Sequence, residues 1–67
     1  MSDEFVPELL VALRRERGLS QRALASLAGV SQALIAELER GKHPPSASSL
    51  NRLSIALNIN PQALARS

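Results

Sequence analysis

The sequence predicts an all-α fold, a compact bundle of five helices formed by one domain over residues 1–67. Three observations predict this class. Apolar residues recur at spacings of three and four, as on one face of a helix. Val and Ile are too scattered to alternate along a pair of strands. Finally, the chain has no cysteine, so helix packing must stabilise the core without disulfides.

The first two helices are expected over 7–17 and 21–28. Pro7 suits the first position of a helix, Gly18 ends the segment, and the apolar stripe between them is Leu9, Leu10 and Leu13. Ser20 supplies an N-cap oxygen for the second helix, whose apolar face is Leu24, Leu27 and Ala28.

The third helix is expected over 32–40 and the fourth over 47–57, and a last short helix begins at Pro61. Ser31 and Ser46 are the N-caps of the third and fourth helices. The apolar stripe of the third helix is Leu34, Ile35 and Leu38. That of the fourth is Leu50, Leu53, Ala56 and Leu57.

Composition excludes several classes of function. The longest apolar run, 9–13, is far shorter than the roughly 20 residues of a membrane-spanning helix, so we expect a cytoplasmic protein with no membrane partner. Phe5 is the one aromatic residue, which leaves no stacking platform for single-stranded nucleic acid, so a nucleic-acid partner would be duplex. The net charge of +2 favours such a partner only weakly.

No catalytic or metal chemistry is expected. His43 is the single histidine and there is no cysteine, so no metal site is predicted. The serines occupy caps and turns, and no histidine–acid pair is placed to activate one as a nucleophile. The sequence therefore predicts a protein that is not an enzyme and needs no cofactor.

The segment 21–40 has the form of a helix-turn-helix, because only a few residues around Gly29 separate its two helices. Here the chain resembles the Cro and cI family of phage repressors and xenobiotic-response-element regulators. The matching segments are LRRERGLSQRALA at 13–25, AGVSQALIAELERGK at 28–42 and PSASSLNRLSIALNI at 45–59. The resemblance implies a lambda-repressor-like bundle whose third helix enters the major groove of DNA while the second crosses the backbone.

By this resemblance Gln32, Ala33 and Glu37 are the candidates for base contact. Gln32 matches a position from which family members reach a base, often adenine, and Ala33 offers a methyl group to thymine. Glu37 departs from the Arg, Lys or Gln that related proteins frequently carry there. It either accepts a hydrogen bond from cytosine or faces solvent.

Five residues are candidates for phosphate contact: Gln21, Arg22, Ser31, Arg40 and Lys42. For Gln21 the alternative is a plain solvated residue at a helix start, and for Ser31 it is the N-cap. Arg14 and Glu39 match a pair that bridges the first and third helices in similar domains. The resemblance therefore assigns Arg14 a structural role.

Because only Arg22, Arg40 and Lys42 among these candidates are cations, a monomer would bind DNA weakly. We therefore expect a homodimer on a palindromic operator. The candidate dimer contacts are Ile59, Pro61 and Leu64, with Leu64 alternatively covering the core. Leu27 is expected to be exposed as a contact surface. The favoured function is a sequence-specific transcriptional repressor. The alternative is an antitoxin or another protein-interaction module, with a toxin or other protein as its partner.

Overall fold

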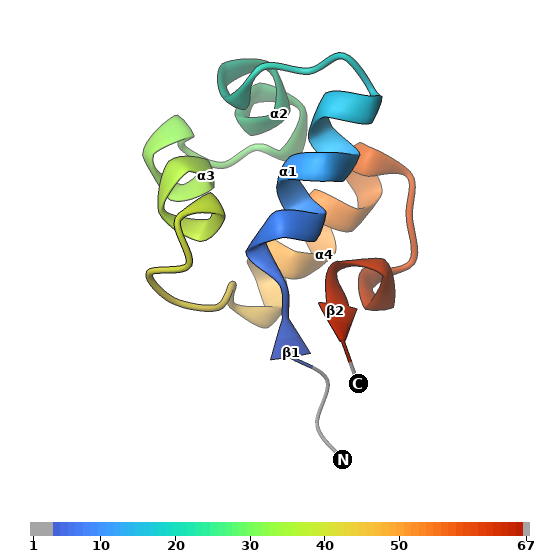
Figure 1. Ribbon diagram of the computed structural model, residues 1–67. Helices are drawn as coiled ribbons and strands as arrows, with labels where there is room; N and C mark the ends of the chain where they lie inside the picture. Colours follow the sequence, from blue (N-terminus) through green and yellow to red (C-terminus); the bar gives the residue numbers. More distant parts are fainter. Residues whose placement is uncertain (1–3, 67) are drawn as a thin grey trace.

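The computed structural model describes residues 4–66, and within them the chain forms four α-helices (Figure 1). The elements in order are β1 (Glu4–Phe5), α1 (Pro7–Glu16), α2 (Gln21–Ala28), α3 (Gln32–Glu39), α4 (Ala47–Leu57), the 3₁₀ helix η1 (Pro61–Leu64) and β2 (Ala65–Arg66). The ranges predicted for the first four helices are confirmed to within one residue at each end. None of the helices in residues 4–66 is both long and apolar enough to cross a membrane.

Serine side chains begin three of these helices, as predicted. The hydroxyl oxygens of Ser20, Ser31 and Ser46 accept hydrogen bonds of 3.0, 3.0 and 3.1 Å from the backbone N–H three residues further on. Each bond satisfies an N–H group that has no partner within the helix, which stabilises a helix by about 1 kcal/mol.

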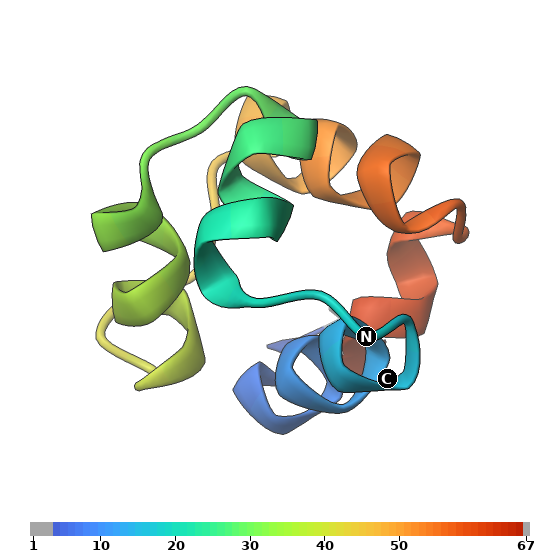
Figure 2. The same cartoon turned by 90° about the horizontal axis from the view of Figure 1, so that it is seen from above.

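The core is a cluster of leucines to which every helix contributes. Its fully buried large side chains are Leu10, Leu24, Ile35, Leu38, Leu53, Leu57 and Leu64. Seen from above (Figure 2), α2 lies between α3 and α4, and α3 stands on the opposite side of the molecule from η1. The apolar stripes of the helices therefore meet at the centre of the molecule, and one face of α3 lies at its surface.

The predicted count of five α-helices is wrong. The segment that begins at Pro61 does start as expected, with the Asn60 side chain accepting a 2.9 Å hydrogen bond from the Gln62 N–H. It ends after four residues, however, because Ala65 is already extended, with φ −128° and ψ 157°. A single 3₁₀ turn is all that fits between these two points.

The expectation that no strands pair is also wrong. Glu4 and Phe5 pair antiparallel with Arg66 and Ala65, and the Val6 N–H donates a 2.8 Å hydrogen bond to the Leu64 carbonyl oxygen. Each strand has two residues, too few to show the alternation by which a strand is recognised in a sequence. The pairing joins the two ends of the described chain at one side of the bundle (Figure 1).

The complete burial of Leu64 predicts that Leu64→Ala lowers the free energy of unfolding by about 3 kcal/mol, because the change removes buried methyl groups and leaves a cavity. Urea denaturation measures this difference. Gln62→Ala, at an exposed position in the same turn, is the control and should change stability by less than about 0.5 kcal/mol. Equal stability of the two variants would contradict the placement of Leu64 in the core.

Candidate nucleic-acid interface

The turn between α2 and α3 fixes the angle at which the two helices meet. Gly29 has φ 70° and ψ 33°, the left-handed conformation in which glycine carries no steric penalty. The Val30 N–H then donates a 3.0 Å hydrogen bond back to the Ala25 carbonyl oxygen. Ala25 and Ala28 are buried, and their small side chains allow the two helices to pack closely.

This geometry divides α3 into a buried face and an outward face. Ile35 and Leu38 have no exposed surface. The predicted base-contact residues Gln32 and Ala33 are exposed at the helix start, and Glu37 is partly exposed one turn after Ala33. All three therefore lie on the side of α3 that faces away from the core.

A buried ion pair holds α3 against α1. Arg14 Nε lies 2.6 Å from Glu39 Oε2 and Arg14 Nη2 lies 3.0 Å from Glu39 Oε1, so the guanidinium donates two hydrogen bonds to one carboxylate. Arg14 Nη1 also donates a 2.8 Å hydrogen bond to the Leu19 carbonyl oxygen before α2. The two side chains are only 10% and 7% exposed. The pairing implied by the resemblance is confirmed, and the Arg14 guanidinium is occupied by contacts within the fold.

The contacts of this pair shift both of its pKa values. The hydrogen bond to Glu39 raises the pKa of Arg14. Burial acts to raise the pKa of Glu39, but the hydrogen bonds donated by Arg14 and Gln21 outweigh it and hold that pKa below its ordinary value. Both groups are therefore charged at neutral pH.

Gln21 belongs to this network, which the sequence did not reveal. Its side-chain Nε2 donates a 3.0 Å hydrogen bond to Glu39 Oε1, so the amide points toward α3. A phosphate contact by Gln21 would therefore use the backbone N–H at the start of α2. The other candidates for phosphate contact are all exposed: Arg22, Ser31, Arg40 and Lys42.

Glu37 has a partner that sequence reasoning also missed. His43 Nε2 lies 3.1 Å from Glu37 Oε1, and His43 Nδ1 lies 3.1 Å from the Pro44 carbonyl oxygen. The chain returns to α3 through Gly41, whose φ is 75°. The hydrogen bonds to Pro44 and to Glu37 raise the pKa of His43 above its ordinary value. The sequence had indicated no metal site at His43 and had given no sign of this contact with Glu37.

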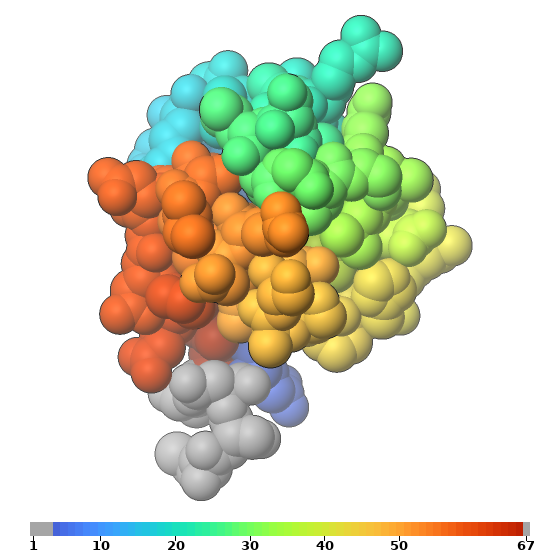
Figure 3. All heavy atoms as spheres, turned by 180° about the vertical axis from the view of Figure 1, so that it is seen from behind, coloured from blue at the N-terminus to red at the C-terminus, as the bar shows by residue number. Residues whose placement is uncertain are grey.

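A second surface, at the C-terminal end of α4, combines exposed apolar side chains with Asn and Ser side chains. Ile55 is 72% exposed and lines a shallow hollow with Ile59 and Pro61, two of the predicted dimer contacts. Ile55 lies outside the apolar stripe of its helix, which is a signal that could have identified it. Leu27 on α2 is 63% exposed, as expected, and α2 packs beside α4 on the face seen from behind (Figure 3).

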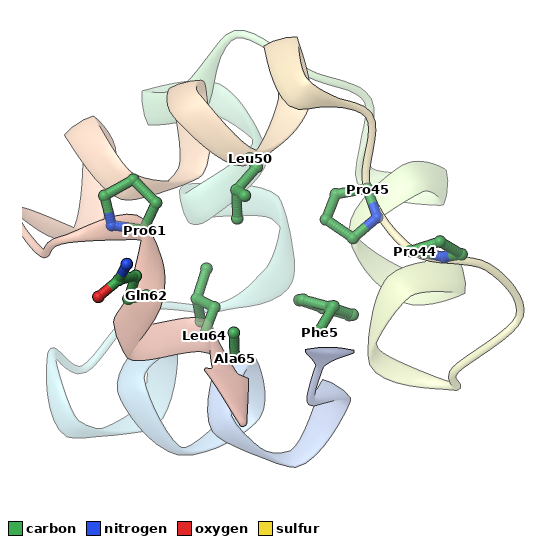
Figure 4. Close-up of a pocket in the computed structure, with 8 residues that line it drawn as sticks. All are labelled: Phe5, Pro44, Pro45, Leu50, Pro61, Gln62, Leu64 and Ala65. Atoms are coloured by element: carbon green, nitrogen blue, oxygen red, sulfur yellow. The ribbon is translucent and has the colours of Figure 1, made fainter. Parts of the chain in front are cut away.

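For Leu64 the structure favours the alternative in which it covers the core. Its side chain points inward toward Leu50, beneath a hollow of about 210 Å³ that lies between Pro44–Pro45 and η1 (Figure 4). Because Leu64 has no exposed surface, it has none to offer a second copy of the chain.

The two short helices α2 and α3 meet at a glycine in the left-handed conformation, and α3 presents a face away from the core. Residues 10–64 of the chain match a family model described as helix-turn-helix. The chain belongs to the Cro/cI-type helix-turn-helix family.

Known helix-turn-helix proteins are similar in sequence and in structure. The immunity repressor protein of Bacillus phage phi105 is 37% identical over 59 residues, which cover 88% of this chain and 41% of the repressor. The P22 c2 repressor in complex with a synthetic operator is 33% identical with a TM-score of 0.84, over 91% of this chain and 92% of that one. The complex of the SinR protein with the SinI protein contains a chain that is 28% identical with a TM-score of 0.83, over 88% of this chain and 58% of that one.

The lowered pKa of Glu39 predicts a specific loss of stability in acid. A depressed carboxyl pKa stabilises the fold above the unfolded value, 4.5, and this contribution is lost as pH falls through the folded value. The free energy of unfolding should therefore fall more between about pH 5 and about pH 3 in the wild type than in Glu39→Gln. At neutral pH the variant should be less stable by about 2 kcal/mol.

Urea denaturation at several pH values checks this prediction. Glu16→Gln is the matched control, because Glu16 pairs with Arg17 at the surface and is itself 72% exposed. It should differ from the wild type by less than about 0.5 kcal/mol. The assignment of the acid response to Glu39 fails if Glu39→Gln loses as much stability in acid as the wild type.

Proposed function

We propose that this chain is a sequence-specific, DNA-binding regulator of transcription, a dimeric repressor that reads the major groove with α3. The observation that carries the proposal is the outward polar face of α3, held in place by a buried ion pair on its other side. The operator-bound P22 c2 repressor shares this fold, and the phage phi105 relative is itself a repressor. An enzymatic role has no support from these relatives.

The residues of α3 suit particular bases. The amide of Gln32 donates and accepts, which matches the N6 and N7 groups of adenine, and the Ala33 methyl suits the methyl of thymine. Glu37 would accept a hydrogen bond from the cytosine amino group. These three side chains lie within the first two turns of the helix, so they can address neighbouring base pairs.

Exposed donors lie near both ends of this reading face. Ser31 immediately precedes α3, whereas Arg40 and Lys42 follow its end. Gln21 and Arg22 begin α2, where the Gln21 side chain contacts Glu39 at the end of α3. Hydrogen bonds from such groups to phosphates fix the orientation of a protein on the duplex without reading sequence. Only three of these groups are cations, so one protomer alone would bind weakly.

A dimer would supply the affinity for DNA that one protomer lacks. Its two protomers would contact half-sites of a palindromic operator about 34 Å apart. We place its contact surface at Ile55, Ile59 and Pro61, which line one hollow. Two-fold symmetry would bring these three apolar side chains of each copy, with the Asn and Ser side chains around them, against the same surface of the other. Burying so exposed a side chain as Ile55 is favourable by about 1.5–3 kcal/mol.

A second candidate function, an antitoxin or protein-interaction module, is favoured by one observation. Leu27 is 63% exposed on α2, on the surface of a fold that in SinR also occurs in a complex with another protein. In either function the chain would act in the cytoplasm, a repressor at the nucleoid.

Selection of bound sequences from a pool of random duplex DNA at near-physiological salt separates the two functions. An enriched inverted repeat with half-sites one helical turn apart supports the dimeric repressor. A folded protein that enriches no sequence contradicts it and favours the interaction module.

If Gln32 reads a base, Gln32→Ala should weaken operator binding by about 1–3 kcal/mol and relax preference at one base pair. Repeating the selection with the variant measures both effects. Arg22→Ala is the control: it should weaken binding to all sequences alike and reduce the salt dependence by about one unit. An unchanged sequence preference in Gln32→Ala would show that α3 is placed differently on the duplex.

The proposed dimer surface predicts that Ile55→Glu raises the dimer dissociation constant at least about tenfold, because it places like charges on an apolar contact. Sedimentation equilibrium gives this constant, and the exposure of Ile55 means that the variant should remain folded. Leu27→Glu is the matched control, an equally drastic change at the other large apolar residue that is exposed within residues 4–66. If Leu27→Glu dissociates the dimer and Ile55→Glu does not, the contact lies on α2 instead.

A further inference from the structure

His43 contacts the one acidic residue on the proposed reading face of α3. Its ring nitrogens lie 3.1 Å from Glu37 Oε1 and 3.1 Å from the Pro44 carbonyl oxygen. A carbonyl oxygen only accepts hydrogen bonds, and so does an ionised carboxylate, whereas neutral imidazole has a single N–H. Both contacts are satisfied at once when the ring is an imidazolium.

The charged groups near the His43 ring have opposite effects on its protonation. Lys42 precedes His43 in the loop, and Glu4 of β1 lines the same hollow as Lys42 and His43. Lys42 opposes protonation of the ring, while Glu37 favours it. Arg40, exposed at the end of α3, is the remaining cation nearby in the chain.

We propose that His43 is a positioning residue for DNA recognition: its imidazolium holds the Glu37 carboxylate, so that Glu37 meets DNA as one half of an ion pair. This inference rests on the proposed function. With the ring protonated the pair has no net charge. With the ring neutral, a bare carboxylate faces the duplex on α3 and repels its phosphates.

The sign of the pH dependence follows from this arrangement. DNA favours the protein in which the pair is neutral, so binding strengthens as pH falls through the pKa of His43 and weakens as pH rises through it. Hydrogen bonds to Pro44 and Glu37 raise that pKa above its ordinary value, so the change in affinity lies at higher pH than it would for a free imidazole. The chain has no other histidine to contribute in this range.

The first test needs no DNA. Because His43 is the single histidine, its imidazole gives one set of NMR signals, which can be titrated in the wild type and in Glu37→Gln. The midpoint should fall toward the ordinary value when Glu37 is replaced. An unchanged midpoint would show that the two side chains do not interact, whether or not the protein binds DNA.

The second test uses the duplex enriched by selection. Wild-type affinity should fall about threefold or more between about pH 6 and about pH 8.5. Glu37→Gln should show less than about half of this response, and His43→Gln should be independent of pH and as weak as the wild type at high pH. If Glu37→Gln keeps the full response, His43 acts on DNA directly and the positioning role is refuted.

Arg22→Gln is the matched control in that experiment, because it removes a cation on α2, away from the pair. It should bind more weakly at every pH and keep the wild-type response. If no duplex is bound at any pH, the proposed function fails, while the NMR titration still decides whether His43 holds Glu37. All of these positions are partly or fully exposed, so the variants should retain the fold.

Discussion

The ion pair between Arg14 and Glu39 is the contact on which the arrangement of the helices depends. Arg14 lies on α1, Glu39 ends α3, and the Gln21 amide joins them from the start of α2. A carboxylate this buried is tolerable only because donors from two other helices satisfy it. Apolar packing in the leucine core is non-directional, whereas these hydrogen bonds fix the rotation of α3 about its own axis. The outward face of α3 therefore follows from a contact on its inward side.

Apolar periodicity and caps were enough to predict the helices. Leu34, Ile35 and Leu38 identify the buried face of α3, and Ser31 marks where the helix begins. Such signals act within a few residues of the chain, so they can be read from a single sequence. The pairing of Arg14 with Glu39 came from family resemblance, because spacing alone does not bring together positions so far apart.

What the sequence did not reveal depends on contacts that helix periodicity and capping patterns do not specify. Gln21 has the position of a phosphate donor, but Glu39 is close enough to take its side chain. His43 reaches Glu37 only because the chain turns back at Gly41, and no local pattern gives the direction of that turn. The end strands pair through backbone atoms, which leave no side-chain signature. Ile55 differs, since its place outside the stripe of α4 was visible in the sequence.

The pairing of β1 with β2 also governs when this fold can be completed during synthesis. Leu64 is a core residue, and its carbonyl oxygen accepts a hydrogen bond from the Val6 N–H, near the beginning of the described residues. A ribosome that has released only α1 to α4 therefore presents a bundle with an unfilled core and unpaired ends. Contacts between residues so far apart form only after the intervening chain has emerged. The packing of η1 against α1 and α4 is therefore completed late, once η1 and β2 have left the exit tunnel.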